Sequence, residues 1–170
     1  YGYRDAIILK DSVWNYDDKH VNVYLKLDEG RKYYIRNISW VGNTVYNTDY
    51  LSRLLNMEKG DVYNQKYLNK RLSEDEDAVG NAYWNNGYLF YNLQPTEINI
   101  VGDSIDLEMR ITEGQQAHIN RVKINGNDKL YENVVRRELR TKPGDLFSKD
   151  ALSRSARELA SMGHFDPEAV

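Results

Sequence analysis

Residues 21–27 and residues 105–111 both place an apolar residue at every second position. The apolar positions are Val21, Val23, Leu25 and Leu27 in the first stretch, and Ile105, Leu107, Met109 and Ile111 in the second. A period of two predicts a β-strand with one buried face. The two stretches are offset by 84 residues, from 21 to 105, which suggests that one structural unit occurs more than once.

Three glycine-containing pairs recur at the same offset of 84 residues. They are Glu29-Gly30 with Glu113-Gly114, Gly42-Asn43 with Gly126-Asn127, and Gly60-Asp61 with Gly144-Asp145. Because the chain has 11 glycines among 170 residues, chance predicts fewer than about one glycine match at a given offset. The matches therefore indicate an internal repeat.

One full unit is predicted over residues 29–112, with an α+β fold in the order β-α-α-β-β. Its strands are expected at residues 33–41, 88–101 and 104–112, and its helices at residues 49–57 and about 65–86. The third strand can pair with both others, so we expect a mixed three-stranded sheet in the order first, third, second. Both helices should cover one face of this sheet. The apolar residues of 105–111 should then pack against Leu54, Leu68, Leu72 and Val79.

Partial copies are predicted on both sides of this unit. Residues 1–28 match the closing hairpin of a preceding unit. Residues 113–170 match the opening β-α-α part of a following unit, with Gly163-His164-Phe165 where its next strand should begin. Each piece lacks the partner that would cover its apolar face, so we expect the hairpin of one chain to complete the 113–170 unit of another, head to tail.

Composition and charge narrow the functional classes. Hydrophobic residues make up 41% and charged residues 29%, which is ordinary for a globular protein. The net charge of −3 argues against nucleic acid as a partner, because phosphate contacts need a basic face. The chain has no cysteine, which excludes thiolate metal sites and cysteine nucleophiles.

No motif in the chain indicates a catalytic, cofactor or metal site. The histidines His20, His118 and His164 lie far apart and lack the spacing of a helical metal site, and His164 is expected to pack as a core residue. The acidic run 74–77 could be read as a calcium loop, but Val79 and Asn86 then stand where oxygen ligands are needed. A solvated helix face is favoured for this run.

The repeat resembles the POTRA domain family, and its likeness is greatest to the periplasmic arms of outer-membrane protein assembly factors. The matching residues are Glu29-Gly30, Ile38, Gly42-Asn43, Gly60-Asp61, Tyr63, Leu68, Tyr83, Gly87-Tyr88 and the strand Ile105–Ile111. In the next unit they are Glu113-Gly114, Val122, Gly126-Asn127, Pro143-Gly144-Asp145, Phe147, Leu152 and Gly163-His164-Phe165. The resemblance covers nearly the whole chain.

The resemblance implies a scaffold with a chaperone-like role and no enzymatic activity or cofactor. Such arms lie at the periplasmic face of the outer membrane of Gram-negative bacteria, below an attached membrane β-barrel. They bind unfolded outer-membrane proteins and the accessory subunits of an assembly complex, partly by adding a strand to a sheet edge. Two alternatives stay open: the arm of a two-partner secretion or translocation-type transporter, and an interaction module with a single partner.

The second strand of the full unit is the predicted peptide-binding edge. Pro95 lies within it, and proline lacks the N–H that a central strand donates. The candidate binding residues are Phe90, Asn92, Gln94, Thr96, Ile98 and Ile100. A second proline at Asn99 is expected to weaken peptide binding without touching the core. The neighbouring aromatic residues Tyr83, Trp84, Tyr88 and Tyr91 are expected either in the core or along a binding groove.

Overall fold

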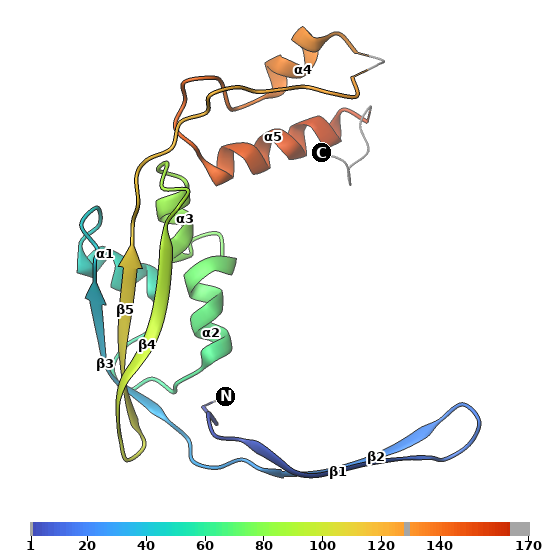
Figure 1. Cartoon of the computed structure of the whole chain (residues 1–170), viewed down its shortest axis with the longest axis vertical. Helices are drawn as coiled ribbons and strands as arrows, with labels where there is room; N and C mark the ends of the chain where they lie inside the picture. The colour runs from blue at the N-terminus through green and yellow to red at the C-terminus, as the bar shows by residue number, and fades with distance from the viewer. Residues whose placement is uncertain (1, 128–129, 164–170) are drawn as a thin grey trace.

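The computed structural model describes residues 2–127 and 130–163 (Figure 1). An antiparallel hairpin of β1 (Ile7–Asn15) and β2 (Val21–Asp28) comes first. The full unit follows, with β3 (Tyr34–Val41), α1 (Thr48–Leu55), α2 (Gln65–Asn69), a π-helical turn η1 (Lys70–Glu74), α3 (Val79–Trp84), β4 (Asn92–Val101) and β5 (Ser104–Thr112). The last part contains α4 (Glu132–Glu138) and α5 (Lys149–Ser161).

The sheet of the full unit has the predicted order. Its strands lie in the order β3-β5-β4, with β3 parallel and β4 antiparallel to β5. The helices α1, α2 and α3 all lie on the same side of this sheet (Figure 1). The predicted mixed three-stranded α+β unit is therefore confirmed.

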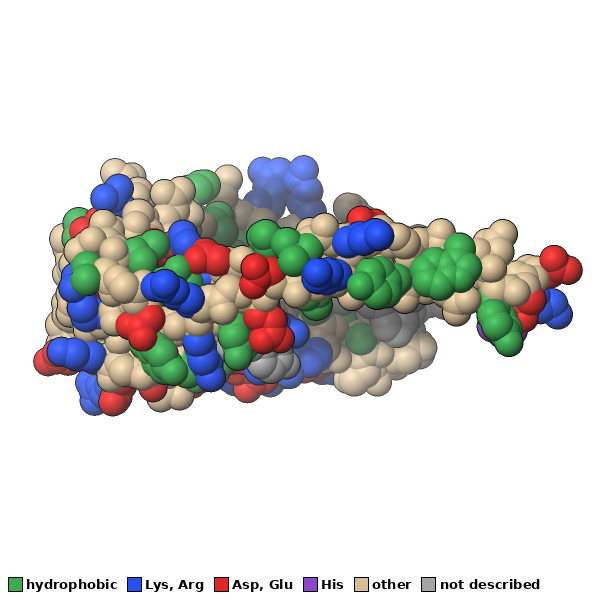
Figure 2. Space-filling model, turned by 90° about the horizontal axis from the view of Figure 1, so that it is seen from below, with side chains coloured by type: hydrophobic (Ala, Val, Ile, Leu, Met, Phe, Trp, Pro, Cys, Tyr) green, Lys and Arg blue, Asp and Glu red, His purple; other side chains and the backbone are tan. Residues whose placement is uncertain are grey.

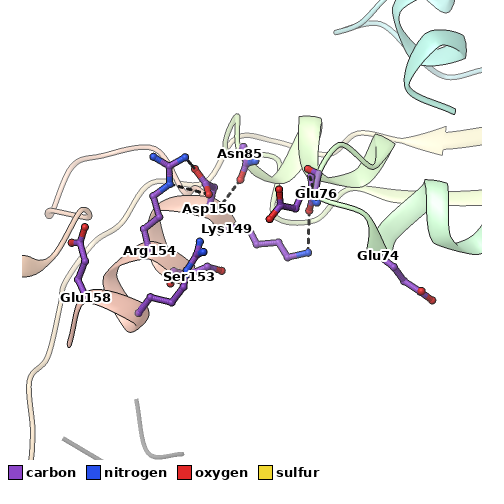
Figure 3. A pocket seen from close by; sticks show the side chains of 10 residues that line it. Glu74, Glu76, Asn85, Lys149, Asp150, Ser153, Arg154 and Glu158 are labelled. Carbon is purple, nitrogen blue, oxygen red and sulfur yellow. Dashed lines mark hydrogen bonds and ion pairs between the residues drawn. The ribbon is translucent and has the colours of Figure 1, made fainter. Parts of the chain in front are cut away.

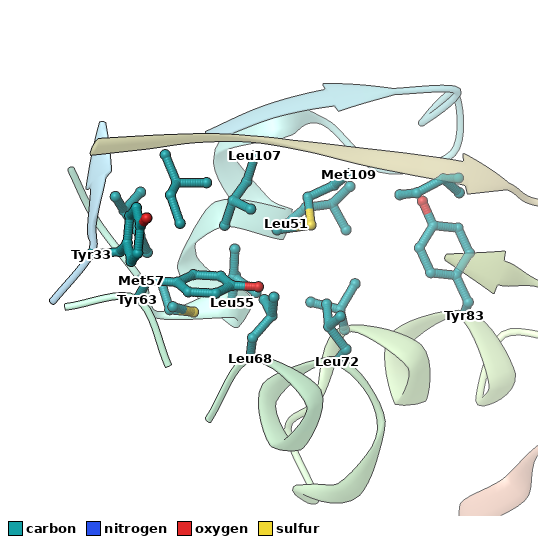
Figure 4. Close-up of a cluster of buried hydrophobic side chains, with 14 residues drawn as sticks. Tyr33, Leu51, Leu55, Met57, Tyr63, Leu68, Leu72, Tyr83, Leu107 and Met109 are labelled. Carbon is teal, nitrogen blue, oxygen red and sulfur yellow. The ribbon is translucent and has the colours of Figure 1, made fainter. Parts of the chain in front are cut away.

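The core of this unit lies between the sheet and the helices (Figure 4). The four alternating residues of β5 are buried to 7% exposure or less and meet Leu68, Leu72 and Val79 from the helical layer. Leu54 is only partly buried and packs against the same cluster. The alternation in the sequence thus identified the buried face of the central strand.

The predicted helix over residues 65–86 is wrong in its continuity. After α2 and η1 the backbone turns extended at Asp75, and helix resumes at Val79. Arg71, 8% exposed, holds this break: its guanidinium donates to the carbonyl oxygen of Leu54 and to the carboxylates of Asp75 and Asp77. The expectation of a solvated helix face is wrong as to the helix, because the run spans the break; Glu74, Glu76 and Asp77 are exposed, and Asp75 and Asp77 also pair with the buried Arg71.

Two β-bulges flank one residue of the central strand. The register shifts between Ile35 and Asn37 on β3, and between Glu97 and Asn99 on β4, both opposite the stretch around Asp106. Asp106 is 8% exposed and accepts hydrogen bonds from the Arg36 guanidinium. Each bulge changes which residues of its strand face the helices, because side-chain direction alternates along a strand.

The β1–β2 hairpin stands apart from the three-stranded sheet and buries little of its own surface. Figure 2 shows hydrophobic side chains along it, interspersed with charged ones. Val13, Val23 and Leu25 are each more than half exposed. A two-stranded hairpin has no second layer to cover either face, so its alternating pattern leaves the apolar side open.

The opening strand of the third unit does not form. Residues 119–127 carry no strand, although they repeat the pattern of β3, and only an isolated bridge joins His118 to Leu146. A strand needs a neighbour for its N–H and C=O groups, and β5, the neighbour of β3, has no counterpart among the described residues of this part. Gly163 ends the described chain, so the expectations for His164 and Phe165 lie outside it.

The hairpin and the third unit lie at opposite ends of the molecule (Figure 1). Their described residues make no pairing with each other within one chain, and the expected head-to-tail pairing between chains stays a prediction. Among the described residues, no helix has the length and apolar character needed to cross a membrane.

Candidate functional site

The two edges of the three-stranded sheet differ in what covers them. At the β3 edge, the segment 60–63 bonds to the main chain of Tyr33 and Ile35: Gly60 and Tyr63 donate to their carbonyl oxygens, and Asp61 accepts from the Ile35 N–H. Within the described chain, no such segment bonds to the main chain of 92–101 outside its pairing with β5. The β4 edge is therefore open along its whole length, whereas the β3 edge is covered at its start, at residues 33–35.

The register of β4 determines which of its main-chain N–H and C=O groups point toward β5 and which point toward the open side. The pair Val101–Ser104 closes the two-residue turn at Gly102-Asp103, and antiparallel partners alternate between hydrogen-bonded and non-hydrogen-bonded pairs. Because β5 has no bulge of its own, its residues 104, 106, 108, 110 and 112 point toward β4. Pro95 faces Met109, a non-hydrogen-bonded position, so its missing N–H lies on the open side.

The same alternation overturns the proline test at Asn99. Asn99 faces Asp106, so its N–H points toward β5 and not toward the open edge. A proline there would remove a bond that holds the sheet together. The bulge between Glu97 and Asn99, which the sequence did not reveal, causes the difference.

The structure separates the six predicted binding residues into three groups. Asn92, Gln94 and Thr96 lie on the sheet face away from the helices, opposite Thr112, Arg110 and Glu108. Ile98 lies within the bulge, and Ile100 faces the buried Ile105 on the helix side. Phe90 lies in the turn before β4 and is 72% exposed. Only the first three share one face, because the bulge reverses the alternation.

A groove of about 400 Å³ runs beside the open edge, between β4 and the helical layer. Leu93 and Pro95 line it from the strand, Leu72 and Ser73 from η1, and Trp84 from α3. The π-helical turn thus forms one wall of the groove. Segments of π-helix inside helices are frequent at functional sites.

The hydroxyl of Tyr91 is unpaired at this groove. It is the one buried side-chain polar atom among the described residues that has no hydrogen-bond partner. The ring stacks on Tyr83 at 4.2 Å and meets Trp84 edge-on at 6.1 Å. Burial raises the pKa of Tyr91, so the hydroxyl stays protonated. An unpaired buried hydroxyl is costly to the folded state.

Segments from the neighbouring units limit the open edge at both ends. At the bulge, Glu97 accepts hydrogen bonds from Arg4 at 2.8 Å and from the Tyr63 hydroxyl at 2.9 Å. At the start of β4, Gly114 lies against Phe90. A Cβ atom added to Gly114 would lie 3.4 Å from the Cβ atom of Phe90. The open stretch is therefore about the length of residues 91–97, with the Glu97 side chain held at its end.

Sequence reasoning missed several residues that shape this site. Neither Arg71 nor Arg4 belongs to a recognisable motif, and each acts through partners distant in sequence. Pro95 was the one local signal for the edge, and the aromatic run was the signal for the groove. Among the described residues, no group of three or more His, Asp or Glu side chains is arranged to hold a metal ion.

The chain belongs to the POTRA family. The sequence model of this family, described as surface antigen variable number repeat, matches residues 33–114 and 117–170. A crystal structure of Haemophilus influenzae BamA POTRA3-5 has the same fold, with a TM-score of 0.76 at 21% identity, over 97% of this chain and 65% of that one.

Two curated relatives are similar along nearly the whole chain, and both are named outer membrane protein assembly factor BamA. The protein of Nitratidesulfovibrio vulgaris is 28% identical over 97% of this chain and 21% of its own length. The protein of Neisseria meningitidis serogroup B is 29% identical, again over 97% of this chain and 21% of its own length. The chain thus spans about one fifth of the length of these relatives.

Proposed function

We propose that this chain is a section of the periplasmic arm of an outer-membrane protein assembly factor, and that its middle unit holds unfolded outer-membrane proteins at the β4 edge. The POTRA family and the BamA relatives support the first part. In this proposal residues 1–28 close a preceding POTRA unit, residues 29–112 form a complete one, and residues 113–170 open the next. The arm would join a membrane β-barrel and act without catalysis or cofactor.

One observation carries the second part: the open β4 edge lies directly beside a groove whose lining combines apolar side chains, Leu72, Trp84 and Leu93, with polar ones. An extended client segment can pair its main chain with the free groups of Leu93 and Glu97, while the carbonyl of Pro95 accepts a further bond. Every second side chain of that segment then points toward the groove. Affinity comes mainly from the main chain, so many different sequences can bind.

The expected strength of binding is low. A net gain of about 0.5–1.5 kcal/mol per hydrogen bond, over the few free groups between residues 91 and 97, must offset the ordering of an unfolded segment. Weak and reversible capture suits a carrier that passes its client on. The exposed Asn92 and Gln94 and the half-buried Thr96 then contact the client from the outer sheet face, and Phe90 from the turn.

A pair of substitutions at Leu93 tests this proposal. The probe is a ten-residue peptide of alternating apolar and polar residues, the pattern of a barrel strand. Leu93→Pro removes the outward N–H as well as the side chain, whereas Leu93→Ala removes only the side chain. We expect Leu93→Pro to weaken binding beyond Leu93→Ala in a calorimetric titration. Equal affinities for the two variants would mean that the strand is not augmented here.

A co-purification experiment separates the alternatives. If the chain binds many clients, it should retain several denatured outer-membrane proteins. If it is a single-partner module, it should retain one folded protein. Accessory subunits of an assembly complex should bind in their folded state, and the Leu93→Pro variant should still retain them. Nucleic acid is not expected among the partners, because the net charge is −3.

A further inference from the structure

Helix α3 is shared between the edge groove and the joint to the third unit. It is six residues long and is separated from η1 by a turn at residues 75–78, which the Ala78 N–H closes by donating to the Asp75 carbonyl oxygen. Trp84, at its end, lines the groove beside β4. The residues that follow Trp84 contact the third unit.

The joint between the second and third units is made almost entirely by the last turn of α3 and the residues after it. The ammonium group of Lys149 lies 4.6 Å from the Trp84 ring centroid and donates to Asn81 Oδ1 at 3.0 Å. Asn85 Oδ1 accepts the N–H of Asp150 at 2.9 Å, so a side chain of one unit caps the second helix of the next. Figure 3 shows Asn85, Lys149 and Asp150 together at this joint.

Main-chain and side-chain bonds extend the joint beyond α5. The N–H of Ala117 donates to the Gly87 carbonyl oxygen at 2.8 Å, and the Gln116 side chain donates to the Asn86 carbonyl oxygen at 3.0 Å. A polar cleft of about 910 Å³ remains between α3 and α5, with Glu74 and Glu76 on one side and Arg154 and Arg157 on the other. The contacts at its inner end therefore decide how the two units are held.

We propose that α3 couples occupation of the edge groove to the joint with the third unit, through the Trp84 ring. This inference rests on the proposed function, since it describes the regulation of the same site. Lys149 holds one side of the ring, and Tyr91 and the groove lie against it as well. A side chain in the groove packs against the ring and restricts it, which strengthens its contact with Lys149 and the cap at Asp150.

Linkage makes the coupling reciprocal. If client binding stabilises the joint, an intact joint must strengthen client binding by the same factor. The joint does this by fixing the Trp84 ring in place as a groove wall before the client arrives. Residues that never touch the client then change its affinity.

The test uses the whole chain and the alternating ten-residue peptide. Lys149→Ala removes the cation over the ring, and Asn85→Ala removes the cap. Lys123→Ala is the matched control, because it removes an exposed lysine of the same unit that has no part in the joint. We expect the first two variants to weaken peptide binding about threefold to tenfold and the control to leave it unchanged. Saturating peptide should also raise the hydrogen-exchange protection of the Asp150 and Ala151 N–H groups in the parent chain.

Two results would overturn the coupling, and they differ in what else they affect. If the peptide binds the parent and all three variants equally, the coupling is refuted and the edge-binding function stands. If the peptide fails to bind the parent chain, both fail. Thermal melts of each variant identify any loss of affinity that comes from unfolding. Because Lys149 lies on the surface of α5, we expect the Lys149→Ala variant to keep the fold.

Discussion

The second and third units share their turns and differ in their sheets. In both units the N–H of the glycine in the Gly-Asp pair donates to a main-chain carbonyl oxygen at 2.7 Å. Gly60 donates to Ile35, and Gly144 donates to Ile119, the equivalent residue of the next repeat. The Asn side chains of the Gly-Asn turns also match: Asn43 donates to Tyr46 at 3.0 Å and Asn127 to Leu130 at 3.1 Å. Yet β3 is a strand and residues 119–127 are not.

The difference separates local from non-local determinants. The bonds of Asn43 and Asn127 need only the residues within each turn, and the bonds of Gly60 and Gly144 join two segments that both copies contain, so both kinds form in both copies. A strand and its core need a partner from elsewhere in the chain, and β5 supplies it only in the second unit. Fourteen buried residues of the second unit form one hydrophobic cluster, whereas Val135 is the buried apolar residue among the described residues of the third unit.

The largest expected effect tests the partner strand itself. Leu107→Asp places a charge at a position that is 1% exposed, which should cost about 4 kcal/mol or more and unfold the second unit. Leu25→Asp makes the same change on the exposed hairpin strand and should leave the main thermal transition in place. A Leu107→Asp chain that melts like the parent would mean that the β5 face is assigned wrongly.

Next in size is the matched pair Gly42→Ala and Gly126→Ala. Both glycines have positive φ, +89° and +75°, so alanine costs about 1–2 kcal/mol at either. A Cβ at Gly42 would also overlap the carbonyl oxygen of Ile111 on β5, whereas nothing lies within 4 Å of one at Gly126. We therefore expect a loss of about 3 kcal/mol at Gly42, measured by urea unfolding. Similar losses at both sites would contradict the role of β5.

A smaller effect concerns Glu113 at the end of β5. Burial acts to raise the pKa of Glu113, but hydrogen bonds from the Thr44 hydroxyl, the Val45 N–H and the Tyr83 hydroxyl outweigh it and lower that pKa. Stability from this group is present above the ordinary pKa of glutamate and is lost as the pH falls through the lowered value.

Glu113→Gln should therefore lower the free energy of unfolding by about 2 kcal/mol at neutral pH. The stability of this variant should then fall less steeply than that of the parent below about pH 4. Glu29→Gln is the control, because Glu29 occupies the same repeat position and its side chain is exposed. Thermal melts between about pH 3 and pH 7 measure both variants. If the Glu113→Gln variant loses stability at low pH as steeply as the parent does, Glu113 is not the carboxylate that causes this loss.

The smallest expected effects are those of the helix caps. Asn64 accepts the Tyr67 N–H and Ser148 accepts the Ala151 N–H, so alanine at either should cost about 1 kcal/mol. Because capping is local, helical signal lost by circular dichroism should be similar for both. A much larger effect at Asn64 alone would show that its cap depends on the sheet.

Sequence reasoning recovered what periodicity and turn chemistry encode. The period of two in 105–111 predicted the central strand, and the repeated glycine pairs predicted the boundaries of the units. It failed where distant partners decide: Arg71 splits a helix by binding Leu54, Asp75 and Asp77, and the bulges near Asp106 reverse the edge strand. Of the candidate site, the edge position was predictable from Pro95, and the face of each side chain was not.

Pro95 also bears on what happens when two copies of this chain meet. An exposed sheet edge is a template for any extended chain, including the same edge of another molecule, and such pairing leads to aggregation. A proline in the middle of the open stretch interrupts a long continuous ladder between two copies, while a short client segment still finds free groups on either side of it. The residue that marks this edge strand therefore also limits pairing between two copies of the chain.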